Sequence, residues 1–191
     1  MKVRPLFVTM LGLGAVVVTC CGALAYGAGA PATTTWLYPA VEGYGGVHPR
    51  PNVPIRPDPA AQYKIVVDVV HTSAGPAKIA NSLIRLARLV NLMAYSAVPH
   101  DHIHIVAVLD ERAGLLALTN AAYRQRFKVD NPNLVLLHRL KAAGVDLLVC
   151  SQAMAEAGLA DSAIAPDVTV TLSALTDFVV FGERGYSYLR L

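Results

Sequence analysis

From residue 63 onward, short apolar runs alternate with helical segments, and this alternation constrains the fold more than any other feature. The apolar runs predict strands at residues 63–70, 102–109, 145–149, 168–172 and 186–189. The segments between them predict helices at residues 77–97, 113–127, 131–143, 153–157 and 173–184. Strands that alternate with helical crossovers form a parallel sheet with right-handed connections. We therefore predict an α/β fold with a mainly parallel five-stranded sheet and helices on both faces.

Five strands with this spacing favour a flavodoxin-like, doubly wound domain, in which the first and third strands are neighbours. His71 follows the first predicted strand, and Cys150 follows the third. That strand order places both residues at the same edge of the sheet. A histidine beside a cysteine stabilises the thiolate, so Cys150 and His71 become candidate catalytic residues.

The stretch Val145-Asp-Leu-Leu-Val-Cys-Ser-Gln152 predicts a strand that ends in a thiol and continues directly into a helix. Ligands and chemistry gather at such turns, because strand carboxyl ends and helix N-termini converge there. The positive end of the helix dipole also favours a thiolate. The alternative is that Cys150 is a small buried residue that finishes a strand, since free cysteine is among the most buried residue types.

Residues 1–25 predict a signal peptide. Lys2 and Arg4 form a positive start, a long uncharged apolar run follows, and Ala23-Leu-Ala25 offers a cleavage site. An uncleaved membrane anchor is the alternative, because the run is close to the ~20 residues that span a bilayer. Lipidation of Cys20 or Cys21 is less favoured, since the preceding residue is not Gly, Ala or Ser. We expect export to the periplasm, with membrane contact only through this segment if it stays uncleaved.

Cleavage would leave Cys150 as the one cysteine of the mature protein, because the other two of three cysteines lie in the leader. An unpaired thiol is unusual in an oxidising compartment, which suggests a shielded thiol or one kept for chemistry. The net charge is +3, and Lys2 and Arg4 account for two of these charges. That charge gives no case for nucleic acid as a partner.

Residues 26–62 are rich in glycine and proline and predict an extended arm or linker ahead of a domain at residues 63–191. The sequence leaves open whether this arm packs on the domain or is a free tether. His100, His102 and His104 lie close enough together for a zinc or copper site, but a polar loop explains them more simply. Asp110 and Glu111 could do acid–base work at a strand end, although solvated loop acids are the simpler interpretation. We therefore predict no metal and no cofactor.

From residue 63 to the end, the sequence resembles the DsrE/DsrF-like sulfur-relay family, in its exported, signal-peptide-bearing branch. The order and spacing of six motifs carry the likeness. They are Lys64-Ile-Val-Val-Asp68, Arg85-Leu-Ala-Arg-Leu-Val-Asn-Leu92, Asp130-Asn-Pro-Asn-Leu134, Leu140-Lys-Ala-Ala-Gly-Val145, Val149-Cys-Ser-Gln152 and Leu172-Ser-Ala-Leu-Thr176.

The resemblance implies a compact α/β fold that assembles into homo-oligomers. It also implies that Cys150 accepts sulfur as a persulfide, as a carrier or sulfurtransferase. Ser151, Gln152, Asp68 and Asn91 are the candidate substrate-binding residues. Ser151 departs from the pattern, because similar exported proteins usually have glycine there.

The expected partners are a sulfur donor or acceptor protein, or a small sulfur species. The alternative function is a non-catalytic ligand-binding or oligomeric assembly module in which Cys150 is a core residue.

Overall fold

The computed structural model describes Met1 and residues 35–191 of the chain. Apart from Met1, the expected signal peptide lies outside the described residues, as does the arm up to residue 34. In the part of the chain that is described, no helix is long and apolar enough to cross a bilayer.

A five-stranded, all-parallel sheet in the order β4-β3-β2-β1-β5 forms the centre of the domain. The strands are β1 (Tyr63–Val69), β2 (Ile103–Leu109), β3 (Val145–Cys150), β4 (Thr169–Thr171) and β5 (Ser187–Arg190). The helices are α1 (Asn81–Tyr95), α2 (Asn120–Phe127), α3 (Leu134–Ala142), α4 (Ser151–Glu156) and α5 (Ala174–Glu183). Short 3₁₀ helices are η1 (His100–His102), η2 (Glu111–Ala117) and η3 (Asp161–Ala163). The predicted α/β class and the parallel five-stranded sheet are confirmed.

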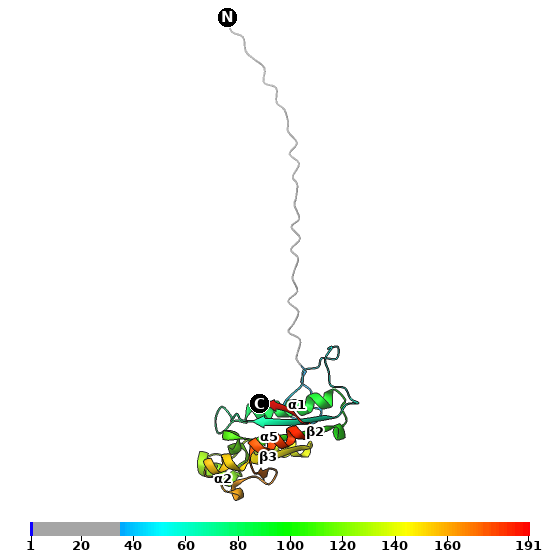
Figure 1. Ribbon diagram of the computed structural model, residues 1–191. Coiled ribbons are helices and arrows are strands. Elements are labelled where there is room, and N and C mark those ends of the chain that lie inside the picture. Colours follow the sequence, from blue (N-terminus) through cyan, green and yellow to red (C-terminus); the bar gives the residue numbers. More distant parts are fainter. Residues whose placement is uncertain (2–34) are drawn as a thin grey trace. The chain divides into compact units, whose positions relative to one another are not determined.

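The expected adjacency of the first and third strands is wrong. The chain passes from β1 to β4 one strand at a time in one direction, and then returns to place β5 on the free side of β1. Figure 1 shows the red terminal strand beside the cyan first strand. The alternation of strands and helices gives the number of crossovers. It does not say on which side of the preceding strand the next strand is added, because a right-handed crossover can lead to either side.

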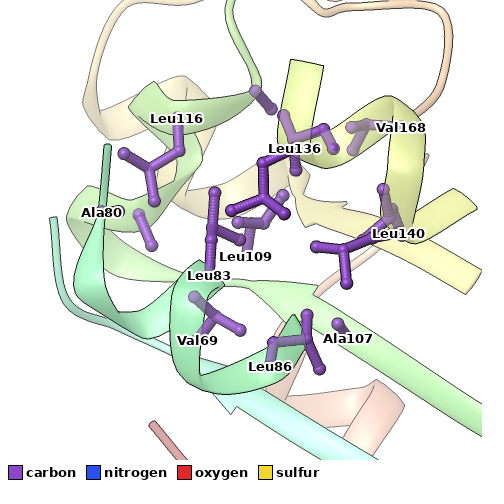
Figure 2. Packing of buried hydrophobic residues seen from close by; sticks show 14 of the residues in the cluster. Val69, Ala80, Leu83, Leu86, Ala107, Leu109, Leu116, Leu136, Leu140 and Val168 are labelled. Atoms are coloured by element: carbon purple, nitrogen blue, oxygen red, sulfur yellow. The ribbon is translucent and has the colours of Figure 1, made fainter. Parts of the chain in front are cut away.

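The larger core lies on the face of the sheet that α1 and α3 cover. Figure 2 shows Leu83 and Leu86 of α1 meeting Ala107 and Leu109 of β2, with Leu136 and Leu140 of α3 beside them. Residues at alternate positions of β1 and β3 complete this core: Val67, Val69, Val145, Leu147 and Val149. The period of two along each strand therefore directs the other set of side chains to the opposite face.

The second face carries a smaller core, and α5 packs on it. Val66, Val106, Val108 and Cys150 form this core together with Ala174 of α5. Phe178 and Phe181 of α5, with Leu148 and Tyr186, pack against its edge. Cys150 therefore lies under α5, on the face opposite to the larger core.

The single helix expected at residues 113–127 is divided in two. Leu118 is extended and bridges Ile164, so η2 ends before it. Thr119 then begins α2 as an N-cap, its side chain accepting a hydrogen bond from the Ala122 amide. The local sequence is compatible with a continuous helix, and the tertiary pairing of Leu118 with Ile164 overrides that preference.

The described part of the arm packs on α1, which answers the question that the sequence left open. Val41 and Val47 of the arm are buried, and Leu37 pairs with Val47. The Asn91 side chain is fully buried and accepts hydrogen bonds from the Ala40 and Val41 amides. Its amide group donates to the carbonyls of Val41, Tyr44 and Gly45. Asn91 is thus the residue that holds the arm.

Two buried asparagines join the loop after η2 to the starts of α1 and α3. The Asn131 amide group donates to the carbonyls of Leu116 and Leu118. Its Oδ1 accepts from both the backbone and the side chain of Asn133. Asn133 in turn accepts from the Ala80 amide, immediately before α1. The Asp130-Asn-Pro-Asn-Leu134 motif therefore has a structural role in this fold.

Candidate functional site

Cys150 is the last residue of β3, and α4 begins at the next residue. Its side chain faces α5, and the residue is 3% exposed. The predicted turn from strand to helix with a thiol at its tip is therefore present. The thiol is covered, however, so any reaction requires a local opening of the structure.

Two polar residues flank Cys150 at its own level in the sheet. Thr171 of β4 is its register partner on one side. On the other side, Val149 pairs with Leu109 of β2, so Asp110 follows at the level of Cys150. The Asp110 amide donates to the Val69 carbonyl, which extends the pairing one residue beyond β2. A φ of 47° at the next residue, Glu111, then turns the chain sharply into η2.

The side chain of Asp177, in α5, reaches the end of β4 at the level of Cys150. Thr171 Oγ1 donates a 2.7 Å hydrogen bond to Asp177 Oδ1. Asp177 Oδ2 is buried and has no hydrogen-bond partner. Burial raises the pKa of Asp177 above its ordinary value, and the negative charge of Asp110 raises it further, against the lowering effect of the Thr171 hydrogen bond.

Asp68 of β1 lies on the same face, one strand beyond β2, and is 5% exposed. The Tyr188 hydroxyl of β5 donates a 2.5 Å hydrogen bond to Asp68 Oδ2, while Oδ1 has no partner. Arg190 Nε lies 3.6 Å from Oδ2. Burial is the largest influence and raises the pKa of Asp68, aided by Asp110 and Glu111 and opposed by Tyr188 and Arg190.

Asp110 and Asp177 lie next to the strand end that carries Cys150, and Asp68 lies on the same face one strand beyond β2. We call these three acids the carboxyl cluster. Three strands, β1, β2 and β3, and helix α5 bring these acids and Cys150 to the carboxyl edge of the sheet, where α/β folds place their sites. Two of its carboxyl groups each have one buried oxygen with no partner. Buried polar groups are normally satisfied, so these exceptions call for a functional explanation.

Ser151 and Gln152 tie the start of α4 to the loop that leads into α5, the helix that packs over Cys150. Ser151 Oγ donates to the Leu172 carbonyl at 2.7 Å, and Gln152 Nε2 donates to the same carbonyl at 3.2 Å. Leu172 lies between β4 and α5. These two candidate substrate-binding residues therefore hold the loop before α5 against the start of α4.

His71 does not lie beside Cys150, because β2 separates the strands that the two residues follow. Its Nδ1 instead hydrogen-bonds to the Leu191 carbonyl at 3.2 Å. The sheet order therefore removes the basis for a cysteine–histidine pair. Asn91 lies on α1, on the other face of the sheet, with its side chain committed to the arm.

A groove of about 380 Å³ opens beside α4. Arg112, Leu115 and Phe127 line one side of it, and Ala153 and Glu156 of α4 line the other. Ala153 also packs in the small core with Cys150. The groove therefore borders the small core that contains Cys150.

His100, His102 and His104 lie in three different environments. His100 lines an apolar cavity of about 310 Å³ at the opposite end of the sheet. His102 Nδ1 hydrogen-bonds to the Pro59 carbonyl, and His104 is exposed on β2. Within residues 35–191, no three His, Cys, Asp or Glu side chains are grouped as a metal site would require.

Residues 64–191 match the DsrE/DsrF-like family. The chain belongs to this family. Membership implies a role in sulfur relay in general. A search of curated proteins found no match.

Two solved structures resemble this DsrE/DsrF-like chain. A protein of unknown function from Methanobacterium thermoautotrophicum is 17% identical, with a TM-score of 0.49. The ychN protein from E. coli is 18% identical, with a TM-score of 0.47. In both comparisons, 68% of this chain and 100% of the other chain are covered.

Asp177, Thr171 and Tyr188 are the site residues that the sequence did not reveal. A signal existed for Asp177, which is the only charged residue in the run Ala-Leu-Thr-Asp-Phe-Val-Val-Phe of α5. An acid in so apolar a helix is either solvated or has a specific role. Thr171 and Tyr188 carried no such signal, because threonine and tyrosine are common in strands.

Replacing Asp177 with asparagine should stabilise this DsrE/DsrF-like domain at neutral pH. The raised pKa means that the folded state binds more protons than the unfolded state, so stability falls as pH rises from about 4 through the native pKa. Asp177→Asn removes this loss, and we expect its melting temperature at pH 7 to rise by roughly 2–4 °C. The gain should shrink toward pH 4.

Thr171→Val is the matched control for that measurement, because it removes the hydrogen bond that the described structure gives to the Asp177 carboxyl group and keeps the shape of the side chain. It should destabilise the domain more at pH 7 than at pH 4. Thermal unfolding at both pH values checks the pair. Equal effects at the two pH values would show that Asp177 is not held as a buried carboxylate.

Proposed function

We propose that this protein is a periplasmic sulfur carrier in which Cys150 accepts sulfane sulfur as a persulfide and passes it to an acceptor. Family membership supports sulfur relay in general. The observation that carries the assignment to Cys150 is its surroundings: Thr171 and Asp110 flank the residue, and Asp177 binds Thr171. A cysteine that only fills a core has apolar neighbours, whereas this one lies at the boundary between a core and a polar cluster.

The transfer needs no cofactor or external oxidant. Cys150 attacks the outer sulfur of a hydropersulfide R–S–SH, a new S–S bond forms to Cys150, and the original S–S bond breaks. The products are Cys150–S–SH and R–SH, so the thiol proton ends on the leaving sulfur. Passing the sulfur on repeats the same exchange with an acceptor thiol.

The cover over Cys150 has to open for this reaction. Its lid is the segment from Leu172 to the start of α5, which the hydrogen bonds of Ser151 and Gln152 hold at the surface. Solvent-exposed hydrogen bonds of this kind each contribute about 1 kcal/mol, so they oppose a brief opening of the lid only weakly. The groove beside Ala153 gives a donor an approach to the lid.

Intact mass after treatment with a hydropersulfide or polysulfide tests the proposal. Cys20 and Cys21 would also react, so the protein should carry Cys20→Ser and Cys21→Ser. We expect an added sulfur atom in this background and none after the further change Cys150→Ser, because Cys150 is then the sole acceptor. Peptide mapping should place the sulfur on Cys150. Absence of an adduct with every donor would refute the proposal.

A second candidate function is a non-catalytic binding or assembly module in which Cys150 is a core residue. The 3% exposure of Cys150 favours it. Thiol labelling separates the two functions. Labelling that occurs only after global unfolding supports the module, whereas labelling through local opening, at a rate independent of global stability, supports the carrier.

We also propose that the protein is exported and forms homo-oligomers. Export rests on residues 1–25 of the sequence. Self-association is supported by α5, whose outer face carries Leu175, 78% exposed, and Val179, 65% exposed, one turn apart. Apolar patches without charge are typical of interfaces between copies of one chain. Sedimentation of the wild-type protein tests this point, and a monomer at micromolar concentration would contradict it.

A further inference from the structure

We infer that Asp177 is the proton-accepting group of the Cys150 site, and that the carboxyl cluster restricts the donor to hydropersulfides that bring no negative charge. This inference rests on the proposed function, because it concerns how sulfur reaches Cys150. It deepens that function by naming a residue role and a substrate class.

The geometry of Asp177 suits proton transfer. One carboxyl oxygen, Oδ1, is fixed by Thr171, which is the register partner of Cys150 on the neighbouring strand. The other oxygen, Oδ2, is buried and unpartnered, so it is free to accept a proton. The carboxyl group is thus anchored to the register partner of Cys150, and its second oxygen is buried without a partner.

Asp68 supplies an independent observation on the same face of the sheet. It is 5% exposed, and its Oδ1 has no hydrogen-bond partner. Its register partner Val108 belongs to the same small core as Cys150, so Asp68 faces this core. A fold that only needed stability would not keep two half-satisfied carboxyl groups on one face.

The charges around the cluster are predominantly negative. β1 contributes Asp68, the turn after β2 contributes Asp110 and Glu111, and α5 contributes Asp177. Arg190 of β5 faces them as a cation, lying 3.6 Å from Asp68 and 3.7 Å from Glu111. The groove beside α4 is balanced in charge, because Arg112 and Arg126 line it together with Glu111 and Glu156. The negative charge is therefore confined to the cluster itself.

This field disfavours anions such as thiosulfate. A hydropersulfide that is protonated on sulfur carries no charge at the reacting atoms, and one with a cationic substituent is attracted. The cluster therefore selects donors by charge before any chemistry occurs.

In the transfer step, Asp177 carries the proton of the Cys150 thiol to the leaving sulfur. Asp177 Oδ2 takes the thiol proton as the Cys150 sulfur attacks the outer sulfur of R–S–SH. The S–S bond of the donor breaks, and its electron pair leaves on the R–S sulfur. Asp177 then returns the proton to that sulfur, which leaves as R–SH, so the carboxylate is restored. The raised pKa of Asp177 is consistent with a group that holds a proton transiently.

Two donors of equal length and opposite charge test the inference: the hydropersulfides of cysteamine and of 3-mercaptopropionate. The protein carries Cys20→Ser and Cys21→Ser, and the rate of sulfur loading on Cys150 is followed by mass spectrometry from pH 5 to pH 9. A short unstructured peptide with one cysteine corrects for the intrinsic reactivity of each donor. We expect the wild-type site to load from the cationic donor at least about tenfold faster than from the anionic one after this correction.

Asp177→Asn should lower the loading rate by about a hundredfold with the cationic donor and flatten its pH profile. The preference between donors should fall as well, because one negative charge is removed. Asp146→Asn is the matched control, since it removes one carboxylate from the opposite end of β3, where Asp146 pairs with Lys141. It should leave both rates within about twofold of wild type. Thr171→Val keeps the carboxylate but frees it, and should give an intermediate rate.

The outcomes separate this inference from the function on which it rests. Failure of the otherwise unchanged chain to load sulfur from either donor overturns both. Loading at equal corrected rates from the two donors, with Asp177→Asn as fast as Asp146→Asn, overturns the inference alone and leaves Cys150 as the carrier.

Discussion

Asn131→Ala should lower the free energy of unfolding by roughly 3–5 kcal/mol, because the alanine leaves two carbonyls and two N–H groups without partners inside the protein. Asn131 is 5% exposed and makes four side-chain hydrogen bonds, two as donor and two as acceptor. The groups that it serves belong to η2, the loop before α2 and the start of α3. The residues that carry these groups are buried, so the loss extends over three elements.

Urea unfolding at neutral pH measures this effect, with Asn120→Ala as the matched control. Asn120 makes one hydrogen bond, to the Asn131 amide, and it is only half-buried. The control should cost about 1 kcal/mol. An Asn131→Ala variant no less stable than the control would show that the asparagine network does not hold these elements together.

Gly45→Ala should release the arm from α1. Gly45 has a φ of 61°, which is unfavourable for alanine, and an added Cβ would lie 2.2 Å from Arg88 N and 2.6 Å from Ala87 C. These are backbone atoms of a helix, which cannot move aside as a flexible side chain does. The arm has to move instead, and it would lose the hydrogen bonds of Asn91. We expect a destabilisation of about 2–4 kcal/mol.

The chain contains one tryptophan, Trp36, which makes this change easy to follow. Trp36 lies in the arm, with the Arg88 guanidinium over its ring. Its fluorescence should shift toward that of a solvated indole in Gly45→Ala, and protease should cut the arm faster. Gly43→Ala is the matched control, because Gly43 has a similar φ of 76° but open space around it. If the two variants behave alike, backbone strain rather than contact with α1 accounts for the effect.

The class of the fold could be predicted from the sequence because it depends on local patterns. Apolar runs of strand length and segments of helical period each bury one face, and these signals survive without tertiary information. The start of β1 at Tyr63 and the end of β3 beside Cys150 follow from such runs. The order of the strands depends on which side of the sheet each crossover turns to, and no local pattern records that choice.

The candidate site likewise has a part that a local pattern predicts and a part that depends on tertiary structure. Cys150 at the end of a strand was predictable from a single stretch of sequence. Its neighbours were not, because Thr171, Asp110 and Asp177 come from three other elements and meet only through strand order and through the path of α5. The pairing with His71 was the reasonable hypothesis for one order and is excluded by another. Asn91 lies in a motif that resembles the family, yet its side chain serves the arm.

The pairing of β5 with β1 joins the first strand of the domain to the last. The Asp68–Tyr188 hydrogen bond spans 120 residues, so the carboxyl cluster is complete only when the final strand docks. Contacts so distant along the chain slow folding, since a large loop must close before they form. A four-stranded intermediate would meanwhile expose the unpaired edge of β1, and exposed edges recruit strands from other molecules. Refolding yield should therefore fall steeply with protein concentration, a practical constraint for anyone who prepares this protein from a denatured state.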